Sequence, residues 1–239
     1  RGLRTKTGIG IQPVYDACLD VSAMQGIVEY QPEELVLTVR AGTTLSAVEA
    51  ALYKANQMLA FEPADLSALL KNKSTGTIGG VLATNLSGPR RLTAGAARDF
   101  LLGFDAVSGR GERFKSGGRV MKNVTGYDLS KLICGSYGTL AVIDEVTIKT
   151  LPRPETSRSL LFESDNMASA VALIAGIFAS PHEPGAAAIL PQPVAAAAGI
   201  DLAADFVVVI RLEGIAMSVD DRASHLCGMD GIGGTVETV

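Results

Sequence analysis

The sequence predicts an α+β protein of two domains. Before Pro152 and Pro154, segments that alternate apolar and polar residues, as half-buried strands do, are mixed with short helical segments. After these prolines the order changes to strand, helix, strand, strand and helix. Because prolines interrupt regular structure, we place the boundary there and expect one domain over residues 1–152 and a second over residues 153–239.

The first domain begins its regular structure with a strand and a helix. Residues 35–41 (LVLTVRA) alternate as a strand does and end at Gly42. Residues 45–56 repeat apolar residues at helical spacing, and Ser46 and Glu49 have the spacing of a capping box near the helix start. The same kinds of signal predict a glycine-led helix over 77–86, a hairpin of 99–107 with 113–115, a helical turn at 129–134 and a long strand over 139–151.

In the second domain, strands are predicted at 160–163, 186–190 and 206–212, with helices over 166–178 and 218–226. This order is most of a ferredoxin-like split βαβ unit. Its closing strand is not predicted, because the glycine-rich residues after the last helix are typical of a loop and the sequence stops shortly after them. We therefore expect an incomplete, truncated ferredoxin-like domain.

The composition is that of a folded protein with an aliphatic core. Hydrophobic residues make up 47% of the 239 residues and charged residues only 19%, which excludes an intrinsically disordered chain. The formal net charge of −4 and the lack of a basic tail argue against nucleic acid as the main partner. The longest clean apolar stretch, residues 168–180, is far shorter than the roughly 20 residues of a membrane-spanning helix.

Cysteines and histidines give no pattern of a metal or disulfide site. Cys18, Cys134 and Cys227 are an odd number without a CxxC pair, so neither a disulfide framework nor a zinc site is predicted. The two histidines, His182 and His225, fit no metal-ligand spacing. We therefore predict no metal.

Glycines are gathered in four clusters, at residues 2–10, 76–88, 117–118 and 126–138. Glycine lets the backbone approach a ligand closely, and successive N–H groups in such turns bind phosphate oxygens. Neither a strand followed by GxGxxG nor a GxxxxGK[ST] loop is present, which argues against the Rossmann and P-loop types of nucleotide site. Each cluster alone is typical of an ordinary turn.

Five stretches taken together resemble one family. TIGGVLATNLSG at 77–88 and RDFLLG at 98–103 resemble the flavin-binding region of the vanillyl-alcohol oxidase, p-cresol methylhydroxylase (PCMH) type of FAD enzymes. KNVTGYDL at 122–129 and GSYGTLAVI at 135–143 match the family in order and spacing, and RGLRTK at 1–6 is similar to its pyrophosphate loop. The resemblance implies an FAD-binding PCMH-type domain, without the strand that should precede Arg1, followed by a cap domain.

The resemblance also implies FAD as the cofactor, bound non-covalently because no histidine follows the pyrophosphate loop. The implied pyrophosphate contacts are Thr5, Lys6, Gly79 and Gly80, where bare N–H groups and a helix dipole would face the phosphates. The other implied FAD contacts are Gly2, Arg4, Pro63, Thr77, Gly135, the ring-lining Ala83, Thr84, Ser87 and Gly88, and the adenine- and ribose-lining Gly138, Val142 and Ile143.

The catalytic residues stay unknown at this point. Arg90, Arg91 and Lys122 are the cations nearest the expected flavin and could orient a substrate carboxylate, although solvated surface residues are the alternative. Tyr127 and Asp128 are expected to anchor their loop rather than to transfer protons.

Within the family, GPRR and NVTGYDLSKL are most similar to the FAD-binding subunits of glycolate oxidase-type 2-hydroxy-acid dehydrogenases. The resemblance implies oxidation of glycolate or D-lactate by hydride transfer to FAD, with a flavoprotein paralogue and an iron–sulfur subunit as partners. The resemblance implies a location in the cytoplasm, or at the inner membrane through those partners. Two alternatives stay open: an accessory or electron-relay subunit without chemistry, and a reductase of cell-wall precursor synthesis with the same fold.

Overall fold

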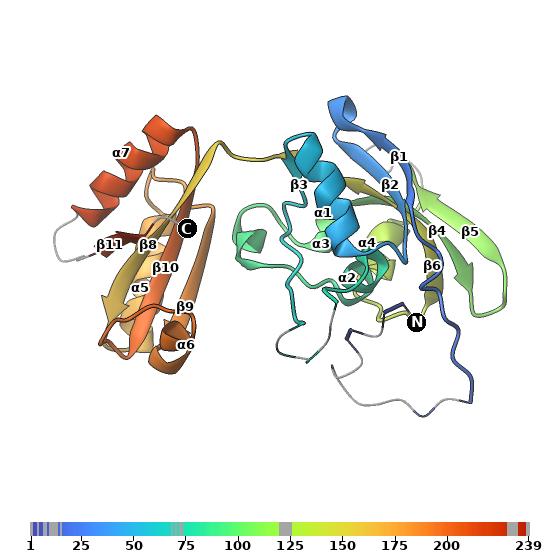
Figure 1. Ribbon diagram of the computed structural model, residues 1–239, viewed down its shortest axis with the longest axis horizontal. Helices are drawn as coiled ribbons and strands as arrows, with labels where there is room; N and C mark the ends of the chain where they lie inside the picture. The colour runs from blue at the N-terminus through green and yellow to red at the C-terminus, as the bar shows by residue number, and fades with distance from the viewer. Residues whose placement is uncertain are drawn as a thin grey trace. The chain divides into compact units, whose positions relative to one another are not determined.

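The computed structural model describes residues 2, 3, 5, 6, 9, 14, 16–67, 69, 71, 74–119, 126–228 and 234–237. The chain forms two compact units (Figure 1). The first unit consists of Arg1–Gly88 and Gly95–Arg153, and the second of Pro89–Ala94 and Pro154–Val239. Among the described residues, no helix is long and apolar enough to cross a membrane.

A five-stranded antiparallel sheet is the centre of the first unit, in the order β1-β2-β6-β4-β5 (Figure 1). Its strands are β1 (Ile27–Gln31), β2 (Val36–Arg40), β4 (Leu101–Ser108), β5 (Arg113–Gly117) and β6 (Ala141–Lys149). Alternation along β2 and β6 predicted both central strands, and the side chains of Leu37, Val39, Val146 and Ile148 are fully buried there. Strand β1 was not predicted.

Helix α1 (Leu45–Lys54) confirms the predicted helix, but its cap differs from the prediction. Thr44, in extended conformation, is the N-cap, and its Oγ1 accepts from the Ala47 N–H at 3.3 Å. The predicted capping box at Ser46 and Glu49 is therefore wrong, and the Ser46 hydroxyl instead lies 3.2 Å from Thr44 Oγ1. The helix starts directly after Thr44, whose hydroxyl supplies the capping oxygen.

The hairpin predicted around Ser108–Gly111 is confirmed, and the Gly111 N–H donates to the Ser108 carbonyl at 2.9 Å. Strand β4 starts later than expected, because Ala97–Phe100 form a short helix, α3. Two further predicted helices are present as α2 (Ile78–Thr84) and α4 (Leu129–Ile133). Three short elements complete the unit: the 3-10 helix η1 (Pro32–Glu34) and the paired strands β3 (Gln57–Met58) and β7 (Leu151–Pro152).

The second unit is an antiparallel sheet in the order β11-β8-β10-β9. Helices α5 (Met167–Phe178) and α7 (Ala216–Cys227) contribute buried side chains to one core with β8 and β10. The short helix α6 (Gln192–Ala197), not predicted, contributes Ala195 to a second cluster. The strands are β8 (Thr156–Ser164), β9 (Ala186–Pro191), β10 (Phe206–Gly214) and β11 (Gly234–Glu237).

Strand β11 corrects the prediction that the ferredoxin-like unit lacks its closing strand. It pairs with β8, from Gly234 opposite Phe162 to Glu237 opposite Ser159. Four residues that follow a glycine-rich stretch are too few for an alternating pattern to stand out. Apart from the short helix α6 between β9 and β10, the order β-α-β-β-α-β matches the ferredoxin-like arrangement.

Candidate FAD-binding site

The start of α2 lies against the turn that follows β2. The Ile78 N–H donates to the Thr43 carbonyl at 3.0 Å and the Gly79 N–H to the Ala41 carbonyl at 2.9 Å. Thr77, the N-cap residue, accepts from the Gly80 N–H through its Oγ1 at 3.2 Å. The expectation that Gly79 and Gly80 offer bare N–H groups to phosphate is therefore wrong, because the Ala41 carbonyl accepts from Gly79 and Thr77 Oγ1 accepts from Gly80.

Gly79 and Gly80 face different surroundings, although they are adjacent. A Cβ on Gly79 would lie 2.7 Å from both the Cβ and the carbonyl oxygen of Ala41, so this position needs glycine for packing. A Cβ on Gly80 would lie 3.2 Å from Thr77 Oγ1 and 3.9 Å from Lys6 Nζ. Gly79 thus fixes the helix on the sheet, whereas Gly80 keeps open the side that faces Lys6.

The N-terminal loop brings three of the predicted residues to this place. A Cβ on Gly2 would lie 3.1 Å from Thr77 Oγ1. Gly76 has a φ of +102°, and a Cβ there would lie 2.7 Å from Thr5 Oγ1 and 3.0 Å from Lys6 Nζ. A hydroxyl and an ammonium group therefore converge on backbone without side chains. Arg4, also predicted here, lies outside the described residues.

Lys6 supplies a partly desolvated positive charge. Burial lowers the pKa of the Lys6 ammonium, and the Asp65 carboxylate nearby opposes part of this shift. Hydrogen bonds from Ser67 lower the pKa of Asp65 itself. Burial, and to a smaller extent Asp65, raise the pKa of Glu49. An anion beside Lys6 would stabilise its charged form, so the surroundings of Lys6 fit a pyrophosphate.

Sequence reasoning left Gly76 out of the residue set, although its cluster was recognised. Its positive φ and its closeness to Thr5 and Lys6 make it part of the same cradle. A side chain at Gly76 or Gly80 would fill the space beside the ammonium group. Small backbone positions around a cation are what close approach of a diphosphate requires, so the residues present fit FAD.

The C-terminal end of α2 is closed by the loop at residues 134–137. The Leu82 carbonyl accepts from the Gly135 N–H at 2.9 Å and from Cys134 Sγ at 3.1 Å. The Ala83 carbonyl accepts from the Tyr137 N–H at 2.7 Å. Burial raises the pKa of the Cys134 thiol to about 12. The N–H of Gly135 is thus engaged within the protein, so a role of this glycine toward FAD would rest on its backbone conformation.

The predicted ring-lining residues follow in one half-buried segment. The Thr84 hydroxyl donates to the Gly80 carbonyl at 2.9 Å, and Ser87 Oγ accepts from the Ala97 N–H at 2.9 Å. The Gly88 N–H donates to the Phe61 carbonyl at 2.9 Å. These bonds hold the segment in one conformation. Of the predicted set, Ala83, Thr84, Ser87, Gly88 and the nearby Pro63 are half-buried.

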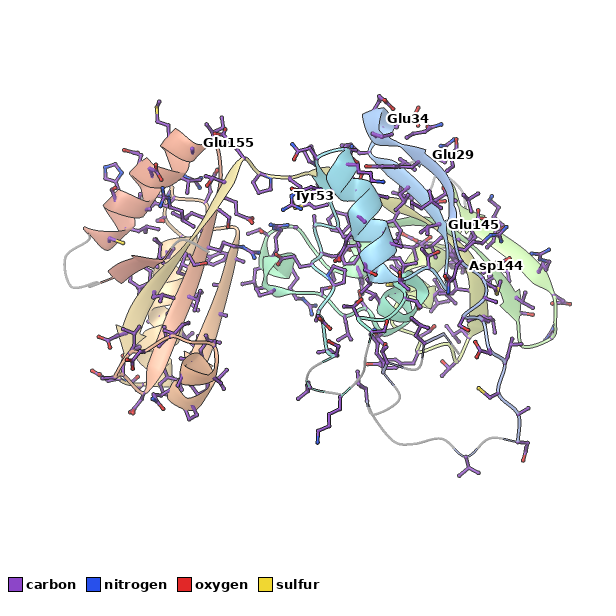
Figure 2. All side chains as sticks on the ribbon, viewed as in Figure 1. Glu29, Glu34, Tyr53, Asp144, Glu145 and Glu155 are labelled. Atoms are coloured by element: carbon purple, nitrogen blue, oxygen red, sulfur yellow. The ribbon has the colours of Figure 1, made fainter. Side chains whose placement is uncertain are left out.

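Val142 and Ile143 lie on β6, where Val142 is half-buried and Ile143 is buried. The next residue is Asp144, which Figure 2 labels beside Glu145. Its carboxylate accepts from Arg40 at 2.8 Å and from Arg113 at 3.0 Å. These three side chains border an open depression of about 510 Å³ on the sheet. None of the predicted FAD contacts lines this depression. Gly138, with a φ of +72°, is exposed in the loop before β6.

The three cations considered for substrate binding have different surroundings. Arg90 is buried and pairs with Glu213, so the surface alternative is wrong for it. Arg91 is exposed. Lys122 lies outside the described residues. Asp128 Oδ1 caps α4 by accepting from the Lys131 N–H at 3.1 Å, consistent with an anchoring role.

Comparisons with known proteins agree with these observations. Residues 1–117 match the FAD binding domain family. Over 160 residues the chain is 48% identical to glycolate oxidase subunit GlcE of Escherichia coli (strain K12). The aligned region covers 67% of this chain and 44% of that protein. The chain is 35% identical over 171 residues to glycolate oxidase subunit GlcD of Bacillus subtilis (strain 168), which covers 71% of this chain and 35% of that protein.

The match to D-lactate dehydrogenase of Archaeoglobus fulgidus is 33% identical over 153 residues, 64% of this chain and 33% of that protein. The chain thus spans less than half the length of these curated relatives. A solved structure of alkyldihydroxyacetonephosphate synthase shares the fold, with a TM-score of 0.72 and 19% identity over 95% of this chain and 46% of that one. Residues 1–117 of the chain therefore belong to the FAD binding domain family.

Proposed function

We propose that the protein is the FAD-binding subunit of a glycolate oxidase-type complex that oxidises glycolate or D-lactate to the 2-oxo acid. The observation that carries this proposal is the 48% identity to glycolate oxidase subunit GlcE. D-lactate dehydrogenases and a second glycolate oxidase subunit among the relatives support 2-hydroxy acids as the substrate class.

When bound, FAD supplies the acceptor for the hydride that leaves C2 of the hydroxy acid. The residues of this chain bind and orient the cofactor. Lys6 and Thr5 bind the pyrophosphate, and Gly76 and Gly80 let it approach the backbone. Ala83, Thr84, Ser87 and Gly88, all half-buried, would lie along the ring system, where small side chains permit flat contact.

Gly138, Val142 and Ile143 would hold the adenine and ribose, on the loop and strand that follow the capping loop of α2. Gly138 is exposed there, with a positive φ that gives the backbone a sharp turn before β6. Val142 and Ile143 supply the aliphatic surface at the start of that strand. We assign no acid or base, because Lys6, the titratable side chain that the described residues place in this cradle, is assigned to the pyrophosphate.

The protein works with partner subunits in this proposal. Two of the relatives carry the names of different glycolate oxidase subunits. We propose a flavoprotein paralogue and an iron–sulfur subunit as partners, the latter to take electrons away from the flavins. These partners would place the protein in the cytoplasm, at the face of the inner membrane.

The test is glycolate-dependent reduction of an artificial electron acceptor by the purified complex, with and without Gly80→Val in this subunit. If FAD in this subunit accepts the hydride, the substitution removes both the FAD of the subunit and most of the turnover. Full turnover by a complex whose mutant subunit is free of FAD would contradict the proposal.

That contradicting result would favour the second candidate, an accessory subunit that leaves the chemistry to its paralogue. One observation favours this candidate. His182 and His225 stack on each other with ring centroids 6.0 Å apart, and His225 Nδ1 lies 3.4 Å from Asp221. Both histidines belong to the second unit, whereas Lys6 belongs to the first.

A further inference from the structure

One hydroxyl group close to helix α2 is buried without a partner. Ser136 lies in the loop that closes the C-terminal end of α2, and its Oγ has no hydrogen-bond partner among the described residues. Other hydroxyls of α2 are paired: Thr77 Oγ1 accepts from the Gly80 N–H at 3.2 Å, and the Thr84 hydroxyl donates to the Gly80 carbonyl at 2.9 Å. Because a buried hydroxyl that makes no hydrogen bond destabilises the folded protein, the presence of one here needs an explanation.

The backbone around Ser136 is bonded on every side. The Ser136 N–H donates to the Ile133 carbonyl at 3.1 Å, and the Ser136 carbonyl accepts from Thr139, from its N–H at 3.0 Å and from its hydroxyl at 2.6 Å. The N–H groups of the two neighbours, Gly135 and Tyr137, donate to carbonyls of α2. The loop would have to break these bonds in order to carry the Ser136 hydroxyl to another part of the protein.

The loop also has an unusual backbone conformation. Gly135, Tyr137 and Gly138 have φ angles of +88°, +55° and +72°. Glycine adopts such angles readily, but a residue as bulky as tyrosine rarely does. Backbone strain of this kind is concentrated at functional sites, where the surrounding structure maintains it. The conformation of the loop is therefore consistent with a binding role for the residue that it surrounds.

Ser136 lies next to two groups of proposed FAD contacts within the first unit. The following residue, Tyr137, donates its N–H to the carbonyl of Ala83, which is proposed to line the flavin ring. Gly138, proposed to hold the adenosine half, comes directly after Tyr137. FAD carries acceptor oxygens and nitrogens along its whole length. Because Ser136 as a whole is half-buried, rotation about its Cα–Cβ bond can turn the hydroxyl toward such an acceptor without moving the backbone.

We propose that Ser136 is a cofactor-binding residue, whose hydroxyl donates a hydrogen bond to an acceptor atom of FAD. The cofactor supplies the partner that the described residues do not. This role rests on the proposed FAD site and is independent of the substrate. It adds one side-chain contact at the end of α2 where the backbone groups are bonded within the protein.

A second half-buried serine of the first unit provides a matched control. Ser108 Oγ accepts from the Arg110 N–H at 3.2 Å, in a hairpin that carries none of the proposed FAD contacts. The experiment compares Ser136→Ala with Ser108→Ala in the full-length protein, by FAD titration and by urea denaturation without FAD. We expect Ser136→Ala to weaken FAD binding by about five- to tenfold, which corresponds to one net hydrogen bond, and to leave the urea midpoint unchanged or higher. Ser108→Ala should lower the urea midpoint and leave FAD affinity unchanged.

Two results would overturn the proposal. If Ser136→Ala binds FAD within twofold of the wild type, the hydroxyl makes no bond to the cofactor. If Ser136→Ala lowers the urea midpoint of the FAD-free protein as much as Ser108→Ala does, the hydroxyl supports the fold instead. Ser136→Cys keeps the shape but donates weakly, and it repeats the comparison if Ser136→Ala does not fold. We expect Ser136→Cys to weaken FAD binding at least threefold, and wild-type affinity there would equally overturn the proposal.

Titrations with FMN and AMP, the two halves of FAD, identify the half that accepts the hydrogen bond. The half whose affinity falls together with that of FAD in Ser136→Ala carries the acceptor atom. Failure of the proposed glycolate activity is distinguishable from failure of this inference. A wild-type protein that binds FAD but supports no glycolate turnover contradicts the proposed function and leaves the comparison of Ser136→Ala with Ser108→Ala intact.

Discussion

The two ends of helix α2 are held in different ways. At its start, Gly79 is pressed against Ala41, while Gly80 faces Lys6 and the N-terminal loop. At its end, the carbonyls of Leu82 and Ala83 accept hydrogen bonds from the loop at residues 134–137. Both ends have polar backbone groups bonded within the protein, but the first end also keeps a cation beside glycine positions that carry no side chain. We infer a binding role for the first end and a supporting role for the second.

Gly79→Ala should have the largest effect on stability. The new Cβ would lie 2.7 Å from the backbone oxygen of Ala41, and backbone cannot move aside as a flexible side chain can. We expect a loss of about 2–3 kcal/mol in the free energy of unfolding, measured by urea denaturation. Gly109→Ala is the control, because a Cβ there meets nothing within 4 Å, and it should change stability by less than about 0.5 kcal/mol.

Lys6→Met should weaken FAD binding at the start of α2 without unfolding the protein. Loss of a charge-assisted contact with a phosphate costs about 1.5–3 kcal/mol, so FAD affinity should fall by about tenfold or more, as measured by flavin fluorescence titration. Because burial lowers the pKa of Lys6, the wild type should also bind FAD more weakly as the pH rises and the ammonium loses its proton. A Lys6→Met protein with the same pH profile as the wild type would contradict the assignment.

Alkaline pH should lower the free energy of unfolding through Cys134, in the loop that contacts the C-terminal end of α2. The pKa of Cys134 is about 12 in the folded protein, above that of an unfolded thiol, so the folded state keeps its proton longer. This contribution to stability is complete below the unfolded pKa and is lost as the pH rises toward 12. Between pH 8 and pH 10, the wild type should lose about 1 kcal/mol more than Cys134→Ala does. Equal losses in the two proteins would show that the thiol is not protected there.

Lys131→Met should have the smallest effect. Lys131 Nζ lies 2.8 Å from Asp99 Oδ1, but both side chains are about 40% exposed, so water screens the pair. We expect a loss of about 0.5 kcal/mol in stability and unchanged FAD affinity. Because the hydrogen bond from Lys131 is the main cause of the lowered pKa of Asp99, that pKa should rise in the variant, as measured by NMR titration.

Local sequence patterns predicted most of the helices and strands. The features that these patterns missed depend on contacts between residues distant in the sequence. Alternation and turn residues are local, so β2, α1 and the hairpin at Ser108–Gly111 were predictable. The Ala41 carbonyl that receives the Gly79 N–H is not a local signal. Likewise, Arg90 and Arg91 are identical residue types, and only Glu213, 123 residues beyond Arg90, distinguishes them.

Hydrogen exchange of the full-length protein with and without FAD tests the contrast between the two ends of α2 most directly. We predict that FAD slows exchange most strongly in the peptides that cover residues 2–6 and 74–80. The peptide that covers residues 134–137 should change less, because it contacts the opposite end of α2 from the one that faces Lys6. FAD-dependent protection confined to residues 134–137, with no change at 74–80, would contradict the assignment of the pyrophosphate to the start of α2.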